Sequence, residues 1–255
     1  MKSIKLRLGL FLFFLGLLGI LSLLTLEIPM TAEAKAILER HLSPFQIKLL
    51  NLINPTTTIL LIAVVIGVQL QKKGNLKTSV FESVVSGKLV PPLMPILMPG
   101  ILGGIIAGIA TTLIAAIYKP LLPQEFIEAG KKLQPGIAVR FLYGGITEEI
   151  MMRFGLMTLI VWFGCDFSHK SSAIIYWAGI VIAAVLFALS HFPIVYQTIP
   201  EPTFTLLSYI LIGNVTGGII FGWLYWKKGL ESAMFAHIIG HAVILLAGYL
   251  TNLSV

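Results

Sequence analysis

The chain has 255 residues, of which 57% are hydrophobic and 11% are charged, and its formal net charge is +7. Soluble globular domains carry about 25% charged residues, so this composition excludes an ordinary soluble domain and indicates an integral membrane protein. The basic residues are scattered over connections between apolar segments and form no stripe interleaved with aromatic residues. We therefore expect contact with the lipid bilayer and no nucleic-acid partner.

The apolar segments predict an all-α, polytopic transmembrane helical bundle of about seven spans, within a range of six to eight. The first segment is longer than the apolar region of a signal peptide, so we expect it to be retained as an anchor. Asn54-Pro55 is expected to interrupt the second span, and residues 192–203 are expected to form a loop. The predicted spans cover residues 8–26, 49–70, 92–118, 135–164, 172–191, 204–226 and 230–250.

The distribution of basic residues predicts the topology. With the N-terminus inside, the inner segments hold ten lysines and arginines and the outer segments hold six. Lysine and arginine accumulate on the cytoplasmic side of membrane proteins. The sequence therefore predicts a plasma-membrane or inner-membrane protein with a cytoplasmic N-terminus. No internal repeat or soluble region is visible, so residues 1–255 are expected to form a single integral membrane domain.

The predicted span 135–164 contains four charged residues, and three of them, Glu148, Glu149 and Arg153, lie together inside its apolar run. Charges inside a membrane span are costly and are functional candidates by default. On an α-helix, Glu149 and Arg153 lie four residues apart with the acid on the N-terminal side, which favours an ion pair. Glu148 would point about 100° away from Glu149. Two carboxylates in different surroundings titrate apart, which is how one of them becomes a usable acid or base.

Three histidines lie in the later spans. His191 ends the fifth span, and His237 and His241 lie four residues apart in the seventh, on one helix face. A lone histidine in a membrane span is more often a hydrogen-bonded core residue than a catalyst. Together with the two glutamates and the arginine, three histidines favour a shared polar site, because buried polar groups need partners.

The motif series resembles that of the CAAX protease and bacteriocin-processing family, which includes the type II CAAX prenyl endopeptidases. The resemblance rests on Glu148-Glu149-x-x-x-Arg153, Phe187-x-x-x-His191 and His237-x-x-x-His241, the last preceded by Gly229-Leu230-Glu231-Ser232-Ala233. It implies a catalytic core at residues 135–250 and an intramembrane endopeptidase acting on membrane-associated polypeptides, with prenylated, pheromone-type or bacteriocin-type chains as candidates. The motifs carry no signal for the natural substrate or the oligomeric state.

The resemblance also implies roles for the site residues. Glu148 with His191 would activate a water molecule, His237 and His241 would stabilise the oxyanion, and Glu149 and Arg153 would orient the site, with Phe187 as a structural residue. The family usually has asparagine where this chain has His241. Histidine can also bind zinc, so a set of Glu148, His191, His237 and His241 is an alternative to metal-free catalysis without a cofactor.

Two other functions use the same residues. A non-proteolytic membrane adaptor or immunity protein of the same fold would use the polar cluster only as structure. A proton-coupled transporter would use the ionisable side chains as a relay, but the chain shows no inverted repeat and no matched pair of broken helices.

The peptidase hypothesis has one geometric difficulty. His191 would lie about 30 Å from the inner end of its span and His237 about 10 Å from the inner end of its own. Straight, perpendicular helices would keep the two rings apart. We nevertheless expect them to meet, through tilted or broken helices that line a polar cavity.

Overall fold

The computed structural model describes residues 2–26, 37–132, 135–199 and 201–251, and every regular element within them is a helix. Seven of these helical stretches are long and apolar enough to cross a membrane. The prediction of an all-α bundle with about seven spans is therefore confirmed. The candidate spans are Ser3–Thr25, Pro44–Leu70, Met94–Leu121, Val139–Ser168, Ala173–Thr198, Phe204–Lys228 and Leu230–Thr251.

The α-helices are α1 (Lys2–Ser22), α3 (Pro44–Lys48), α4 (Asn54–Leu70), α5 (Ser79–Ser86), α6 (Met94–Tyr118), α7 (Gln124–Lys132), α8 (Thr158–Ser168), α9 (Ala173–Leu189), α10 (Phe192–Thr198), α11 (Phe204–Lys228) and α12 (Leu230–Thr251). Short 3₁₀-helices are η1 (Leu23–Thr25) and η3 (Lys119–Leu121). Three further segments are π-helical: η2 (Leu49–Ile53), η4 (Val139–Glu148) and η5 (Ile150–Met157).

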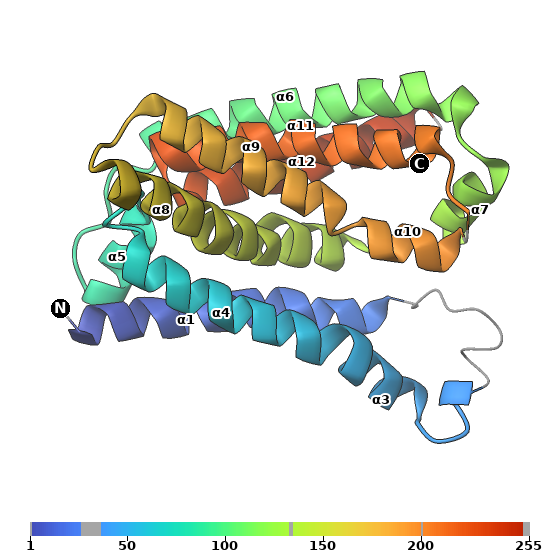
Figure 1. Ribbon diagram of the computed structural model, residues 1–255, viewed down its shortest axis with the longest axis horizontal. Coiled ribbons are helices and arrows are strands. Elements are labelled where there is room, and N and C mark those ends of the chain that lie inside the picture. The colour runs from blue at the N-terminus through green and yellow to red at the C-terminus, as the bar shows by residue number, and fades with distance from the viewer. Residues whose placement is uncertain (1, 27–36, 133–134, 200, 252–255) are drawn as a thin grey trace.

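The span Val139–Ser168, made of η4, η5 and α8, lies in the middle of the bundle (Figure 1). On one side it packs against α1 and α4, and on the other against α9 and α12. Helix α6 closes the far side by packing on α11 and α12. The segment that carries both glutamates is therefore surrounded by other helices, which can supply partners for its charges.

Glycines let α6 and α12 approach closely. A Cβ added at Gly104 would lie 2.5 Å from the carbonyl oxygen of Ala236 and 2.6 Å from Cβ of Ile239. Small residues at regular spacing allow this kind of close helix packing in membranes. The helix that bears His237 is thus fixed along its length against α6.

The middle span departs from the predicted single α-helix over residues 135–164. It begins at Val139, ends at Ser168, and is π-helical from Val139 to Met157 apart from Glu149. In a π-helix each N–H bonds the carbonyl five residues back, so a turn holds more residues than in an α-helix, and the predicted 100° between Glu148 and Glu149 does not apply. Two side-chain hydrogen bonds have the same five-residue separation. The hydroxyl of Thr147 donates to the carbonyl oxygen of Leu142, and that of Thr158 donates to the carbonyl oxygen of Arg153.

Two expected irregular segments are helical instead. Residues 192–198 form α10 rather than the expected loop, with Pro193 in its first turn, where the missing N–H is not needed. Asn54-Pro55 does not interrupt the second span, because the π-turn of η2 leads directly into α4 and places Pro55 in the first turn of that helix. Both differences have one cause: each proline lies in the first turn of a helix and marks the start of that helix, not a break in it.

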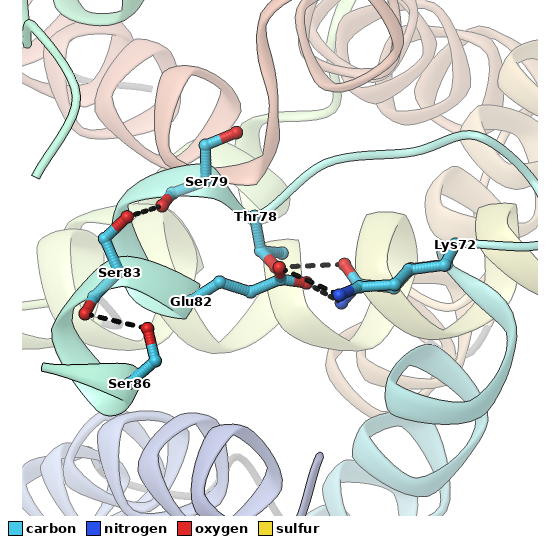
Figure 2. A network of polar contacts seen from close by, with 7 residues as sticks. Lys72, Thr78, Ser79, Glu82, Ser83 and Ser86 are labelled. Atoms are coloured by element: carbon cyan, nitrogen blue, oxygen red, sulfur yellow. Dashed lines mark hydrogen bonds and ion pairs between the residues drawn. The ribbon is translucent and has the colours of Figure 1, made fainter. Parts of the chain in front are cut away.

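A polar network holds the connection between α4 and α5. Lys72 pairs with Glu82 at 3.1 Å, and Gln71 donates to the other Glu82 oxygen at 2.9 Å (Figure 2). The Gln71 side chain also accepts from Thr78 at 3.0 Å. From the other side, the carboxylate of Glu231 in α12 accepts from the backbone N–H groups of Val80 and Phe81 at 2.8 and 3.0 Å. This connection is therefore ordered and tied to α12.

Candidate active site

Glu149 is the centre of a buried charge cluster. Its carboxylate is 0% exposed and lies 3.2 Å from Nε of Arg153, which is 1% exposed. The other carboxylate oxygen lies 2.8 Å from Nδ1 of His237 in α12. The predicted ion pair between Glu149 and Arg153 is thus present, and the same carboxylate joins the middle span to α12. Both groups are sequestered from water, so each depends on the other for its charge balance.

The guanidinium of Arg153 is held by three further groups. Nη2 donates to the carbonyl oxygen of Gly218 at 3.2 Å. The guanidinium carbon lies 5.4 Å from the ring centre of Phe187 and 5.6 Å from that of Phe221, which are cation–π distances. Arg153 therefore connects the middle span to α9 and α11 as well as to Glu149.

Glu148 lies in different surroundings from its neighbour. Its side chain is partly exposed, and it forms no hydrogen bond or ion pair with any described residue. It interacts electrostatically with Glu149 and Arg153, and also with Tyr143. Glu149 thus contacts both Arg153 and His237, whereas Glu148 forms no hydrogen bond or ion pair with a described residue.

His237 and His241 form a stack in α12. The His237 ring lies between Phe221, at 4.6 Å, and His241, at 4.9 Å. A Cβ added at Gly144 would lie 2.7 Å from Nε2 of His241 and 3.7 Å from Nε2 of His237, so both Nε2 atoms approach the same point of the middle span. Gly144 precedes Glu148 by about one helical turn.

The hydrogen bonds of His237 define which ring nitrogen is available. An ionised carboxylate only accepts hydrogen bonds, so the contact with Glu149 assigns a proton to Nδ1 of His237. This leaves Nε2 as the atom that can meet a ligand. In His241, Nδ1 is buried without a hydrogen-bond partner among the described residues.

His191 lies between α9 and α10, directly before Phe192, and no hydrogen bond joins it to Glu148 or His237 among the described residues. Its ring lies 4.8 Å from that of Phe187, and it interacts electrostatically with His237. The ring Nδ1 lies 2.9 Å from the carbonyl oxygen of Phe187, which can only accept, so Nε2 of His191 is left with a free lone pair. Figure 1 shows α9 running obliquely to α11.

A pocket of about 160 Å³ borders the stacked imidazoles. Phe187, His237 and His241 line it together with residues of α6 and α11. It extends along α12 from His237 to Ile244, a length of about 10 Å at the α-helical rise. The end of α9 and the histidine pair of α12 therefore share one cavity.

The alternative zinc set does not fit this arrangement. A zinc site needs three or four nitrogen, oxygen or sulfur ligands within about 2.3 Å of one point. Within the described ranges, no three side chains of histidine, cysteine, aspartate or glutamate are grouped so that they could hold a metal ion.

Several residues of this region were not singled out from the sequence. Phe221 stacks on His237, Gly144 leaves room for both Nε2 atoms, and Asn214 lines the pocket. Asn214 carried a usable signal, because an amide side chain inside an apolar span needs a partner. Phe221 and Gly144 carried none, since aromatic residues and glycine are common throughout membrane helices.

Residues 132–243 match the family model described as type II CAAX prenyl endopeptidase Rce1-like. A search of curated proteins and a search of solved structures each returned no match. The matched segment contains every residue of the motif series, from Glu148 to His241. The division into one domain, 1–255, with a catalytic core at 135–250 stays a prediction. Over residues 132–243, this match supports the predicted resemblance to the CAAX protease and bacteriocin-processing family, in a chain that has seven helical stretches long and apolar enough to cross a membrane among its described residues.

Proposed function

We propose that this protein is an intramembrane endopeptidase that hydrolyses membrane-associated polypeptides with a water molecule activated by Glu148. The observation that carries the proposal is the contrast between the two adjacent glutamates. Glu149 is buried and bound by Arg153 and His237, whereas Glu148 is partly exposed and has no hydrogen-bond partner among the described residues. A free carboxylate beside an ordered charge cluster is suited to act as a general base.

In the proposed reaction, the carboxylate of Glu148 and Nε2 of His191 bind one water molecule between them. Its oxygen attacks the peptide carbonyl while Glu148 takes its proton, which then passes to the leaving amide nitrogen as the C–N bond breaks. The free lone pair at Nε2 of His191 supports this role, because it can accept the second hydrogen of the same water.

The negative charge on the carbonyl oxygen would be stabilised by His237 and His241, whose Nε2 atoms approach one point of the middle span. For His237 this role requires both ring nitrogens to carry a proton, with Nδ1–H held by Glu149. Donors that are fixed before the reaction stabilise a developing oxyanion most effectively. Glu149 and Arg153 act here as positioning residues. No metal or other cofactor takes part in the proposed steps.

The substrates we propose are polypeptides that reach the site from the membrane, and prenylated, pheromone-type and bacteriocin-type chains are the candidates. The family match supports this class, since it is one of prenyl endopeptidases. The basic residues of the predicted inner segments support a cytoplasmic N-terminus in a plasma or inner membrane.

The test is cleavage of membrane-anchored peptides by the purified protein reconstituted in lipid vesicles. Glu148→Gln should lower the rate by about 10²–10⁴-fold, the usual contribution of a general base, without lowering the thermal midpoint. Glu82→Gln, which changes a glutamate of the α4–α5 connection, is the matched control and should cleave at the wild-type rate. Wild-type cleavage by Glu148→Gln would remove Glu148 from the mechanism.

A non-proteolytic adaptor or immunity protein is the second candidate, because the cluster around Glu149 also has the form of a structural network. It predicts that the wild-type protein cleaves no peptide in the same assay and that Glu149→Gln alters only stability.

A further inference from the structure

The pocket beside the imidazoles has features that the reaction itself does not need. Six of its fifteen lining residues are glycine or alanine, and they come from three helices; among them are Gly108 of α6, Gly213 and Gly217 of α11 and Gly240 of α12. Close helix packing accounts for Gly108, where an added Cβ would lie 2.6 Å from Cβ of Val243. At Gly213 an added Cβ would meet no heavy atom within 4 Å. Packing therefore gives no reason for the absence of a side chain at Gly213.

The size of the pocket limits what it can hold. Its volume of about 160 Å³ is close to that of an engineered protein cavity of about 150 Å³ that binds benzene. One branched aliphatic side chain or one phenyl ring fits such a space.

Polar side chains, among them those of Asn214 and His241, also lie in the lining of the pocket. Nδ1 of His241 is buried and has no partner among the described residues. The amide nitrogen of Asn214 donates to the carbonyl oxygen of Ile210 at 2.8 Å, which leaves its amide oxygen as an acceptor. An apolar space with a few polar groups is typical of a site that binds one defined part of a ligand.

We propose that this pocket binds one substrate side chain next to the bond that is cleaved, and that the absence of a side chain at Gly213 sets the largest residue it admits. The inference rests on the proposed endopeptidase function, because its position beside His237 and His241 places the bound side chain close to the reacting carbonyl. The side chain it takes is leucine, isoleucine, methionine or phenylalanine.

The experiment uses the full-length protein in vesicles and a set of membrane-anchored peptides that carry alanine, leucine or phenylalanine at each position near the cleavage site. For the wild-type protein, one position should favour leucine or phenylalanine over alanine in kcat/KM. Gly213→Ala and Gly213→Val should then lower the phenylalanine-to-alanine ratio at that position alone. Changes of one methyl or methylene in an apolar pocket are worth about 10–200-fold in selectivity.

Ile212→Val is the matched control, because Ile212 is the neighbouring residue of α11, is 40% exposed and does not line the pocket. It should leave the ratio unchanged. Cleavage that depends on Glu148 but keeps the same phenylalanine-to-alanine ratio in Gly213→Val would overturn the pocket assignment alone. If no peptide is cleaved, or if Glu148→Gln cleaves as well as the wild type, the proposed function fails and the pocket assignment fails with it.

Discussion

Removing the positive charge of Arg153 gives the sharpest test of the buried cluster. The Nε of Arg153 lies 3.2 Å from a Glu149 oxygen, and the two side chains are 1% and 0% exposed. At an effective dielectric constant of about 20, two unit charges at this distance attract by about 5 kcal/mol. Arg153→Met would leave Glu149 buried without its counter-charge, and breaking a buried pair in this way costs about 3–5 kcal/mol.

The assay is thermal unfolding of the purified protein in one detergent. For a chain of this size, about 3–5 kcal/mol corresponds to a fall in the thermal midpoint of about 6–20 °C. Lys72→Met is the control, because Lys72 pairs with Glu82 at the similar distance of 3.1 Å but is 65% exposed. Exposed pairs contribute about 0–1 kcal/mol, so this midpoint should change little.

The double variant Glu149→Gln/Arg153→Met separates the charge effect from lost packing. Glutamine can still accept from Nδ1 of His237, and no uncompensated charge remains. The double variant should therefore unfold at a higher temperature than Arg153→Met alone. Equal midpoints for Arg153→Met and Lys72→Met, or a double variant less stable than Arg153→Met, would refute the reasoning.

Two further predictions concern helix α12. Gly104→Leu should separate α6 from α12, because even an added Cβ at this position would lie 2.5 Å from the carbonyl oxygen of Ala236. The thermal midpoint should therefore fall. Gly213→Ala, where an added Cβ meets no heavy atom within 4 Å, should not lower the midpoint. Glu231→Ala should free the N-terminus of α5, since its carboxylate accepts from Val80 and Phe81, at a cost of about 0.5–2 kcal/mol. Limited proteolysis should then cut residues 71–88 faster than in the wild type. An unchanged cleavage rate would show that the hydrogen bonds of Glu231 do not stabilise this connection.

Part of the site could be predicted because it depends on spacing within one helix. Glu149 and Arg153 face each other in the structure as the four-residue interval predicted, and both imidazoles of α12 lie on one side of that helix. The span count followed in the same way from the length of each apolar segment. These features need no knowledge of how the helices pack.

The remainder depends on contacts between distant segments. The bond from His237 to Glu149 joins residues 88 positions apart, and those from Glu231 to Val80 and Phe81 cover 151 and 150 positions. The π-helical form of residues 139–157 has no composition signal, because its glycines and aliphatic residues are equally common in α-helical spans. The tilt of α9 relative to α11 is likewise set by packing against neighbouring helices, not by the sequence of α9.

The position of the charge cluster in the chain also has a consequence for biogenesis. The segment with Glu149 and Arg153 is translated before α11 and α12, which supply the carbonyl of Gly218 and the imidazole of His237. While the ribosome is still making those last two helices, the pair has only itself for charge balance within the bilayer. Insertion of the C-terminal helices thus completes the fold, and a nascent chain released before Gly218 would expose two poorly solvated charges to the quality-control proteases of the cell.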